Sequence, residues 1–249
     1  GLLGADDSNR YMAVSINEAG SDWGRIEVFD IATKTRLSDR LEWVKFSGAT
    51  WYKDGFFYNR YPAPEKGKEL SGNNEYHMVY YHKLGTDQSQ DQLVYRDNER
   101  PHMYNMISAT EDKKFLILNA APGTDGWEVW IKNPEDTQGK FKPLFTDISL
   151  HNSIIESTAD GHLLMHTDAD APRYRLVQID PNNPGKENWK EIVPQTDMML
   201  QGVSTCGGKL FLSYLDRANT RIFVCNYDGS DKKEIAMPDK TGSAAGFSG

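Results

Sequence analysis

Long apolar runs are missing from this sequence. No stretch of its 249 residues approaches the roughly 18 consecutive apolar residues that a membrane-spanning helix needs, so we expect neither an integral membrane protein nor a membrane partner. Residues 1–7 carry no basic side chain and no apolar core of a secretory leader, and no signal peptide is visible. The compartment stays open between cytoplasm and periplasm.

Cysteine and basic residues are also scarce. Only Cys206 and Cys225 occur, which excludes a disulfide scaffold; we expect two buried free thiols within one structural repeat. Lysine and arginine number 28 against 36 aspartates and glutamates, a net charge of −8. A surface this acidic argues against nucleic acid as a partner.

Motifs for metal, phosphate and nucleophile chemistry are absent. The sequence has no Cys-x-x-Cys, no His-Glu-x-x-His and no phosphate-binding loop. His162 and His166 would lie about 13 Å apart in an extended chain, too far to share one metal ion. The string GFSG at residues 246–249 is an incomplete nucleophile elbow with no helix after it. We therefore assign no catalytic residue, no metal and no cofactor.

Short aromatic and β-branched runs, separated by Gly, Pro, Asp and Asn, fill the chain instead. Aromatic residues make up 11% of it, and such runs favour strands over helices. The pattern predicts an all-β protein. The expected strands include residues 11–17, 26–31, 56–61, 78–82, 115–120, 163–166, 175–179, 210–215 and 221–225.

One unit repeats along the chain: a short strand, a tight polar turn, an apolar strand, a third strand and a weaker fourth. The first turn is marked by Asp7, Asp54, Asp112, Asp160 and Gly207, at spacings of 47, 58, 48 and 47 residues. Asp and Gly suit it because they tolerate the backbone of a tight hairpin. The extra residues of the second unit fall in 62–74, which we expect to be an exposed loop.

Four strands in a period near 47 residues are typical of a β-propeller blade. The sequence thus predicts about five blades, with a sixth beginning at residues 242–249. The alternative fold is a β-sandwich with evenly spaced turns. Propellers hide their edge strands by closing the ring. Because this chain stops one strand into a blade, we expect it to be part of a longer protein and to form homodimers through open edges.

Several segments then indicate a family. They are GSDW at residues 20–23, DRLEWVKFSG at 39–48, DGFFYNRYP at 54–62, VYYHKLGTDQSQD at 79–91, YRL at 174–176 and GSAAGFSG at 242–249. Together they resemble the propeller domain of the prolyl oligopeptidases (prolyl endopeptidases), which are serine peptidases with an α/β-hydrolase catalytic domain. The resemblance covers essentially the whole chain.

The resemblance implies a seven-bladed propeller that caps the hydrolase domain and excludes large folded substrates. Residues 1–249 look like a partial propeller, comprising blades two to six and the first strand of the next. The serine, aspartate and histidine of the family's triad would lie in the hydrolase domain, which this chain lacks. The chain alone is then no enzyme, although its parent would be a serine-type prolyl endopeptidase. Its implied partner is a short proline-containing peptide, met through the hydrolase domain.

The family's propeller also lends side chains to the substrate pocket. By resemblance these positions match Phe46, Tyr104 and Thr124, and Asp22 matches a residue that faces the domain interface. Familiar members carry Met and Cys where this chain has Tyr104 and Thr124. From the residues alone, a ring beside Gly48 fits a small apolar pocket or the core equally well.

Two other functions fit a propeller. A stand-alone propeller would bind proteins without a catalytic domain. A five-bladed glycosidase would place two or three carboxylates around its central tunnel, and most carboxylates here belong to turns instead.

Overall fold

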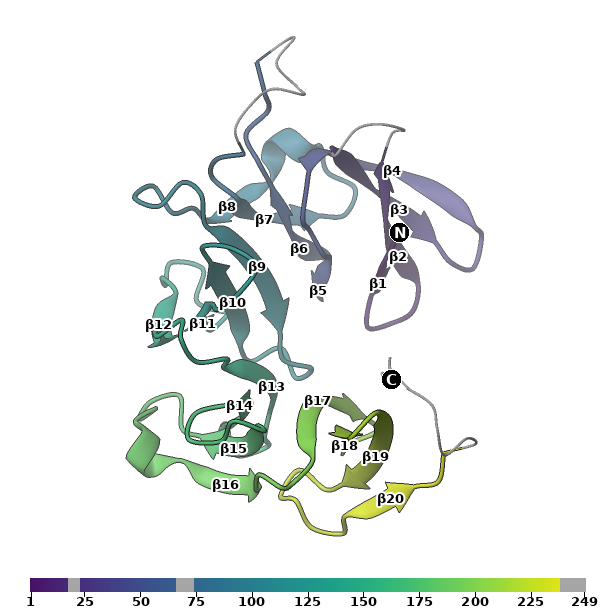
Figure 1. The fold of residues 1–249 in the computed structure, drawn as a ribbon. Helices are drawn as coiled ribbons and strands as arrows, with labels where there is room; N and C mark the ends of the chain where they lie inside the picture. Colours follow the sequence, from purple (N-terminus) through teal and green to yellow (C-terminus); the bar gives the residue numbers. More distant parts are fainter. Residues whose placement is uncertain (18–22, 66–73, 238–249) are drawn as a thin grey trace. The chain divides into compact units, whose positions relative to one another are not determined.

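The computed structural model describes residues 1–17, 23–65 and 74–237, and in these ranges the chain is almost entirely β-structure. Twenty strands and two short 3-10 helices, η1 (Gln88–Gln90) and η2 (Lys186–Asn188), occur there (Figure 1). None of the described helices has the length and apolar character needed to cross a membrane. The all-β prediction is confirmed.

The strands form five four-stranded antiparallel sheets, one for each predicted blade (Figure 1). The first sheet has the order β1-β2-β3-β4 and the second β5-β6-β7-β8. Their strands are β1 (Leu2–Ala5), β2 (Tyr11–Asn17), β3 (Gly24–Asp30), β4 (Thr35–Val44), β5 (Thr50–Tyr52), β6 (Gly55–Arg60), β7 (Met78–Lys83) and β8 (Gln92–Tyr95).

The other three sheets repeat the same order of strands. The third is β12-β11-β10-β9, the fourth β13-β14-β15-β16 and the fifth β17-β18-β19-β20. Their strands are β9 (Tyr104–Ala109), β10 (Leu116–Ala121), β11 (Glu128–Lys132), β12 (Lys142–Phe145), β13 (Ser153–Ser157), β14 (Leu163–Thr167), β15 (Arg175–Ile179), β16 (Lys190–Val193), β17 (Met199–Cys206), β18 (Lys209–Asp216), β19 (Asn219–Cys225) and β20 (Lys233–Ile235).

The repeating turn joins the first two strands of every sheet, as the sequence predicts. Each copy contains a left-handed residue, but glycine supplies it only in the last two sheets. The residues with positive φ are Asn9 (55°), Lys53 (50°), Lys113 (57°), Gly161 (84°), and Gly207 and Gly208 (56° and 72°). Side chains also hold the backbone of the turn in place. In the first sheet, the carboxylate of Asp6 accepts hydrogen bonds from the amides of Arg10 and Tyr11, at 2.8 and 2.7 Å.

Two inner strands, β6 and β14, are buried on both faces. In β6 the first five residues are buried, and in β14 all five are. Side chains of a strand alternate between its two faces, so continuous burial means that both faces are covered. This explains why these strands read as unbroken apolar and aromatic runs.

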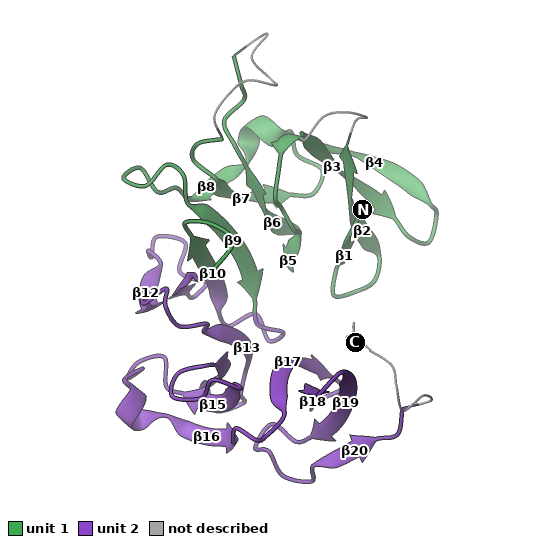
Figure 2. Cartoon of the chain, in the orientation of Figure 1, with its two compact units in different colours: residues 1–109, 118–125 green, residues 110–117, 126–249 purple. Residues whose placement is uncertain are grey.

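The chain divides into two compact units (Figure 2). The first comprises Gly1–Ala109 and Leu118–Asp125, and the second comprises Thr110–Ile117 and Gly126–Gly249. A core of the first unit joins the first two sheets through Ile26, Leu41 and Phe56. In the second unit, Leu164 and Leu212 belong to a core shared by the fourth and fifth sheets.

Three sequence predictions require comment. Cys206 and Cys225 are both free thiols of the fifth sheet, but only Cys225 is buried. The expectation of two buried thiols is wrong because Cys206 ends β17 at a turn. Of the predicted exposed loop, residues 62–65 are described and are mostly exposed. The expected sixth unit, at residues 242–249, lies outside the described residues.

Candidate functional site

Phe46 lies in the loop between β4 and β5 and is displayed on the surface of the first unit. Its side chain is 51% exposed, and its backbone is left-handed, with a φ of 52°. Ser47, the next residue, fixes the loop. Its hydroxyl accepts a hydrogen bond from the amide of Asn59 at 2.8 Å and donates one to the carbonyl of Gly48 at 2.7 Å. The Phe46 ring is therefore exposed on a left-handed backbone position that neighbouring hydrogen bonds hold in place.

The ring of Phe46 meets that of Tyr104, the first residue of β9. Their centroids are 5.5 Å apart and their planes are nearly perpendicular, at 80°, a favourable edge-to-face geometry. The ammonium of Lys45 lies 5.5 Å from the Phe46 ring. The structure thus brings two of the three expected pocket residues together, and the alternative that Phe46 belongs to the core is wrong.

The structure describes one of the other two expected positions. Thr124 is exposed in the bend at residues 122–125, directly after β10. It belongs to the first unit, and β10 pairs with β9, the strand that begins at Tyr104. Asp22, the expected interface residue, lies outside the described residues.

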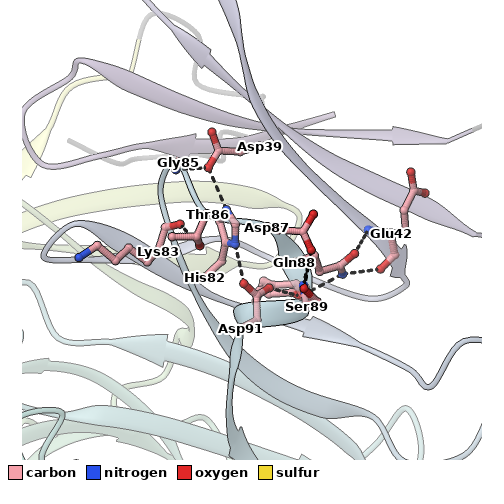
Figure 3. Close-up of polar contacts among 11 residues, drawn as sticks. Asp39, Glu42, His82, Lys83, Gly85, Thr86, Asp87, Gln88, Ser89 and Asp91 are labelled. Atoms are coloured by element: carbon pink, nitrogen blue, oxygen red, sulfur yellow. Dashed lines mark hydrogen bonds and ion pairs between the residues drawn. The ribbon is translucent and has the colours of Figure 1, made fainter.

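In the first unit, a buried histidine lies between two aspartates (Figure 3). His82 of β7 directs Nε2 to Asp39 of β4 at 2.9 Å and Nδ1 to Asp91 at 2.7 Å. All three side chains are at most 1% exposed. Each carboxylate also accepts a second hydrogen bond: the amide of Gly85 donates to Asp39 at 2.6 Å, and the hydroxyl of Tyr58 donates to Asp91 at 2.7 Å.

Gln88 of η1 makes a second link beside this bridge. Its side-chain amide accepts the backbone N–H of Glu42 at 3.0 Å and donates to the carbonyl of Glu42 at 3.1 Å (Figure 3). Its nitrogen also lies 3.1 Å from the hydroxyl of Tyr58. The outer strand of the first sheet is therefore joined to the second sheet by buried polar groups as well as by the apolar core.

The two carboxylates determine the charge of His82. Burial by itself lowers its pKa, but the hydrogen bonds and negative charges of Asp39 and Asp91 outweigh burial and raise the pKa to about 9. Burial likewise opposes ionisation of Asp39, yet the bonds from His82 and Gly85 keep the pKa of this carboxyl below its ordinary value. At neutral pH the group is an imidazolium held by carboxylates.

This bridge does not resemble a catalytic centre. A general base needs one ring nitrogen directed at a nucleophile or substrate, whereas both nitrogens of His82 are occupied by carboxylates. In the described part of the chain, no group of three or more His, Cys, Asp or Glu could hold a metal ion. The bridge therefore acts as a structural ion triplet.

A surface groove of about 900 Å³ lies beside the bridge in the first unit. Its walls include Trp43, Tyr80 and Leu93, together with charged side chains of both signs. The guanidinium of Arg60 lies 4.2 Å above the Tyr80 ring, and Arg40 pairs with Glu42. This mixed lining favours no single class of ligand.

Sequence reasoning missed the His82 bridge. Asp39 and Asp91 stand 43 and 9 residues from His82, and neither distance matches a spacing that local structure would bring together. The available signal was weak: a histidine that follows an apolar and aromatic run within one strand implies a buried polar partner. It could not identify that partner.

Repeated four-stranded antiparallel sheets with one strand order define the class of this protein, a β-propeller. Residues 3–249 match the family described as prolyl oligopeptidase, N-terminal beta-propeller domain. The chain belongs to this family. The resemblance seen in the sequence is thereby confirmed.

Named relatives agree with this assignment. The chain is 38% identical to a prolyl endopeptidase of Elizabethkingia miricola over 99% of this chain and 35% of the relative. It is also 38% identical to a prolyl endopeptidase of Elizabethkingia meningoseptica over 96% of this chain and 33% of the relative. The chain therefore spans about a third of the length of these proteins.

Solved structures share the fold. A structure from a study of two prolyl endopeptidases has a TM-score of 0.86 and 29% identity, covering all of this chain and 36% of the solved one. The apo structure of prolyl oligopeptidase B from Galerina marginata has a TM-score of 0.82 at 25% identity, covering 97% and 35% of the two chains.

Proposed function

We propose that this chain is the non-catalytic propeller of a prolyl oligopeptidase-like serine peptidase. It gates the access of short proline-containing peptides to a hydrolase domain that this chain lacks. The family match over residues 3–249 carries the proposal. The enclosed His82 bridge agrees with a non-catalytic role, because both ring nitrogens are bound to buried carboxylates.

Within that function, we assign Phe46, Tyr104 and Thr124 to the propeller side of the substrate pocket and Asp22 to the domain interface. The exposed Phe46 ring, fixed against Tyr104, would cover apolar parts of a bound peptide. Acyl transfer at the prolyl carbonyl would belong to the hydrolase domain. The propeller would contribute sieving and exclusion of water. Homodimerisation through open edges stays a prediction.

Removing the whole propeller, of which residues 1–249 are a part, from the full-length protein is expected to relax its size limit for substrates. A proline-containing sequence should be cleaved both as a short peptide and as a loop of a folded carrier protein, whereas the intact enzyme should cleave only the short peptide. Mass spectrometry of the products measures this. Retained hydrolysis of the short peptide controls for folding of the remaining domain. Continued rejection of the carrier would contradict gating.

Replacing Phe46 with alanine in the full-length protein is expected to raise KM for a short proline-containing peptide about tenfold, with kcat little changed. Burying an aromatic side chain against a ligand contributes about 1.5–3 kcal/mol, and uniform binding appears in KM. Steady-state kinetics measure it. Leu93→Ala is the matched control, because Leu93 is 47% exposed in the same unit and should leave KM unchanged. Equal KM values for Phe46→Ala and the parent would contradict the pocket assignment.

A further inference from the structure

His77 occupies a second fully buried site, directly before β7, and both of its ring nitrogens bind backbone groups. The amide of Asn105 donates to Nδ1 at 2.9 Å, and Nε2 lies 3.1 Å from the carbonyl of Lys45. Because Nδ1 accepts an N–H and a carbonyl can only accept, the ring proton lies on Nε2. His77 thus bridges two chain segments as a neutral imidazole.

A buried polar network surrounds this ring. The side-chain amide of Asn105 donates to the carbonyl of His77 at 2.8 Å. The side-chain amide of Asn59 donates to the carbonyls of Asn105 and Met78. His77, Asn59 and Asn105 are each at most 1% exposed. The side-chain oxygens of Asn59 and Asn105 are buried without a partner, so the donors of these two amides hold the network together. Moving any of the three residues would leave a further buried donor or acceptor unpaired.

The two backbone groups that His77 binds are sequence neighbours of the Phe46–Tyr104 ring pair. Lys45 precedes Phe46, and Asn105 follows Tyr104. The imidazole also packs on Tyr61, with centroids 4.9 Å apart, and meets the edge of Tyr104 at 6.3 Å. The His77 ring therefore fixes both the loop that carries Phe46 and the strand that carries Tyr104.

Burial keeps the His77 ring neutral at neutral pH. It lowers the pKa of His77 to about 4, although the backbone carbonyls of Lys45 and Phe46 oppose this shift. A second proton would convert Nδ1 into a donor facing the Asn105 N–H. The neutral ring is therefore the form that maintains both contacts.

We propose that His77 is a positioning residue that sets the separation and orientation of Phe46 and Tyr104 and thereby tunes the apolar wall of the peptide pocket. The pocket part of this inference rests on the proposed function; the positioning part does not.

The test compares His77→Phe with His166→Phe. Phenylalanine retains ring packing but removes both hydrogen bonds. His166 is a matched control in the second unit: it is 9% exposed, its Nε2 lies 2.8 Å from the carbonyl of Leu200, and its ring stacks on Tyr174 at 4.6 Å. The first measurement is the nuclear Overhauser effect between the Phe46 and Tyr104 rings in this chain. It should fall by at least half in His77→Phe and stay unchanged in His166→Phe.

The second measurement is KM for a short proline-containing peptide in the full-length protein. We expect a rise of about three- to tenfold for His77→Phe with unchanged kcat, the pattern of altered binding, and no change for His166→Phe. If His77→Phe does not fold, His77→Gln replaces it. The Gln amide can still donate to the Lys45 carbonyl, so an intermediate loss of the ring contact is expected.

The outcomes separate the two claims. An undiminished ring contact in a folded His77 variant overturns the positioning role, whatever the kinetics show. A lost ring contact without a change in KM retains positioning but removes its role in the pocket. If Phe46→Ala also leaves KM unchanged, the pocket assignment itself fails, while the positioning of the two rings stands.

Discussion

Replacing His82 with phenylalanine is expected to lower the free energy of unfolding of this chain by about 3–5 kcal/mol. The substitution retains a ring of similar size but leaves Asp39 and Asp91 buried without their cation. A buried carboxylate that loses its partner incurs most of its desolvation cost. Urea denaturation followed by circular dichroism measures the loss. Faster amide exchange at Gly85, whose N–H binds Asp39, would localise it to this bridge.

The control is His151→Phe. His151 also binds an aspartate, with Nδ1 2.7 Å from Asp168, but these side chains are 30% and 20% exposed. Pairs that water reaches contribute little, so about 1 kcal/mol or less should be lost. Similar losses for the two variants would show that burial of the His82 bridge has no special energetic weight.

Stability of the parent chain is expected to fall as the pH rises from about 6.5 to about 9. In the folded chain the carboxylates raise the pKa of His82 from 6.5 to about 9, whereas in the unfolded chain the proton leaves near 6.5. Between these values the folded state binds more protons, so alkali favours unfolding. The full shift corresponds to at most about 3 kcal/mol. Urea denaturation at a series of pH values measures it.

The same experiment on a variant with His82→Phe, Asp39→Asn and Asp91→Asn provides the control, because it removes the histidine without leaving buried carboxylates unpaired. The fall in its stability between about pH 6.5 and 9 should disappear, whereas the fall in acid should remain. Burial lowers the pKa of both His77 and His166, so the unfolded chain takes up protons first as the pH falls below 6.5, which favours unfolding. An alkaline fall of equal size in this variant would assign that titration to other groups.

Much of the fold follows from local features of the sequence. Residues 11–17 and 175–179 were predicted as strands with the bounds of β2 and β15, because each is an apolar run closed by polar turn residues. The turn between the first two strands was predicted in all five repeats, because its tight backbone favours residues such as Asp and Gly. Asn9, Lys53 and Lys113 adopt that backbone without being glycine, so a search for glycine at this one position would have missed three of the five turns, and the regular spacing was needed.

The candidate site was less predictable. Resemblance indicated Phe46 and Tyr104, but the sequence left open whether Phe46 was exposed. Its exposure depends on Ser47, Asn59 and His77, which come from separate segments. The partners of His82 were missed for the same reason. Such contacts depend on which segments pack together, and neither periodicity nor spacing contains that information.

The His82 bridge also limits how this protein could be rebuilt by recombination. Its cation comes from the second sheet, while one of its two carboxylates, that of Asp39, comes from the first. A chimaera that exchanged only the first sheet with that of a distant homologue would separate a donor from its acceptor. A crossover placed before β1 or after β8 would transfer the complete ion triplet. Although the blades repeat as single units in the sequence, the first two therefore need to be exchanged as a pair.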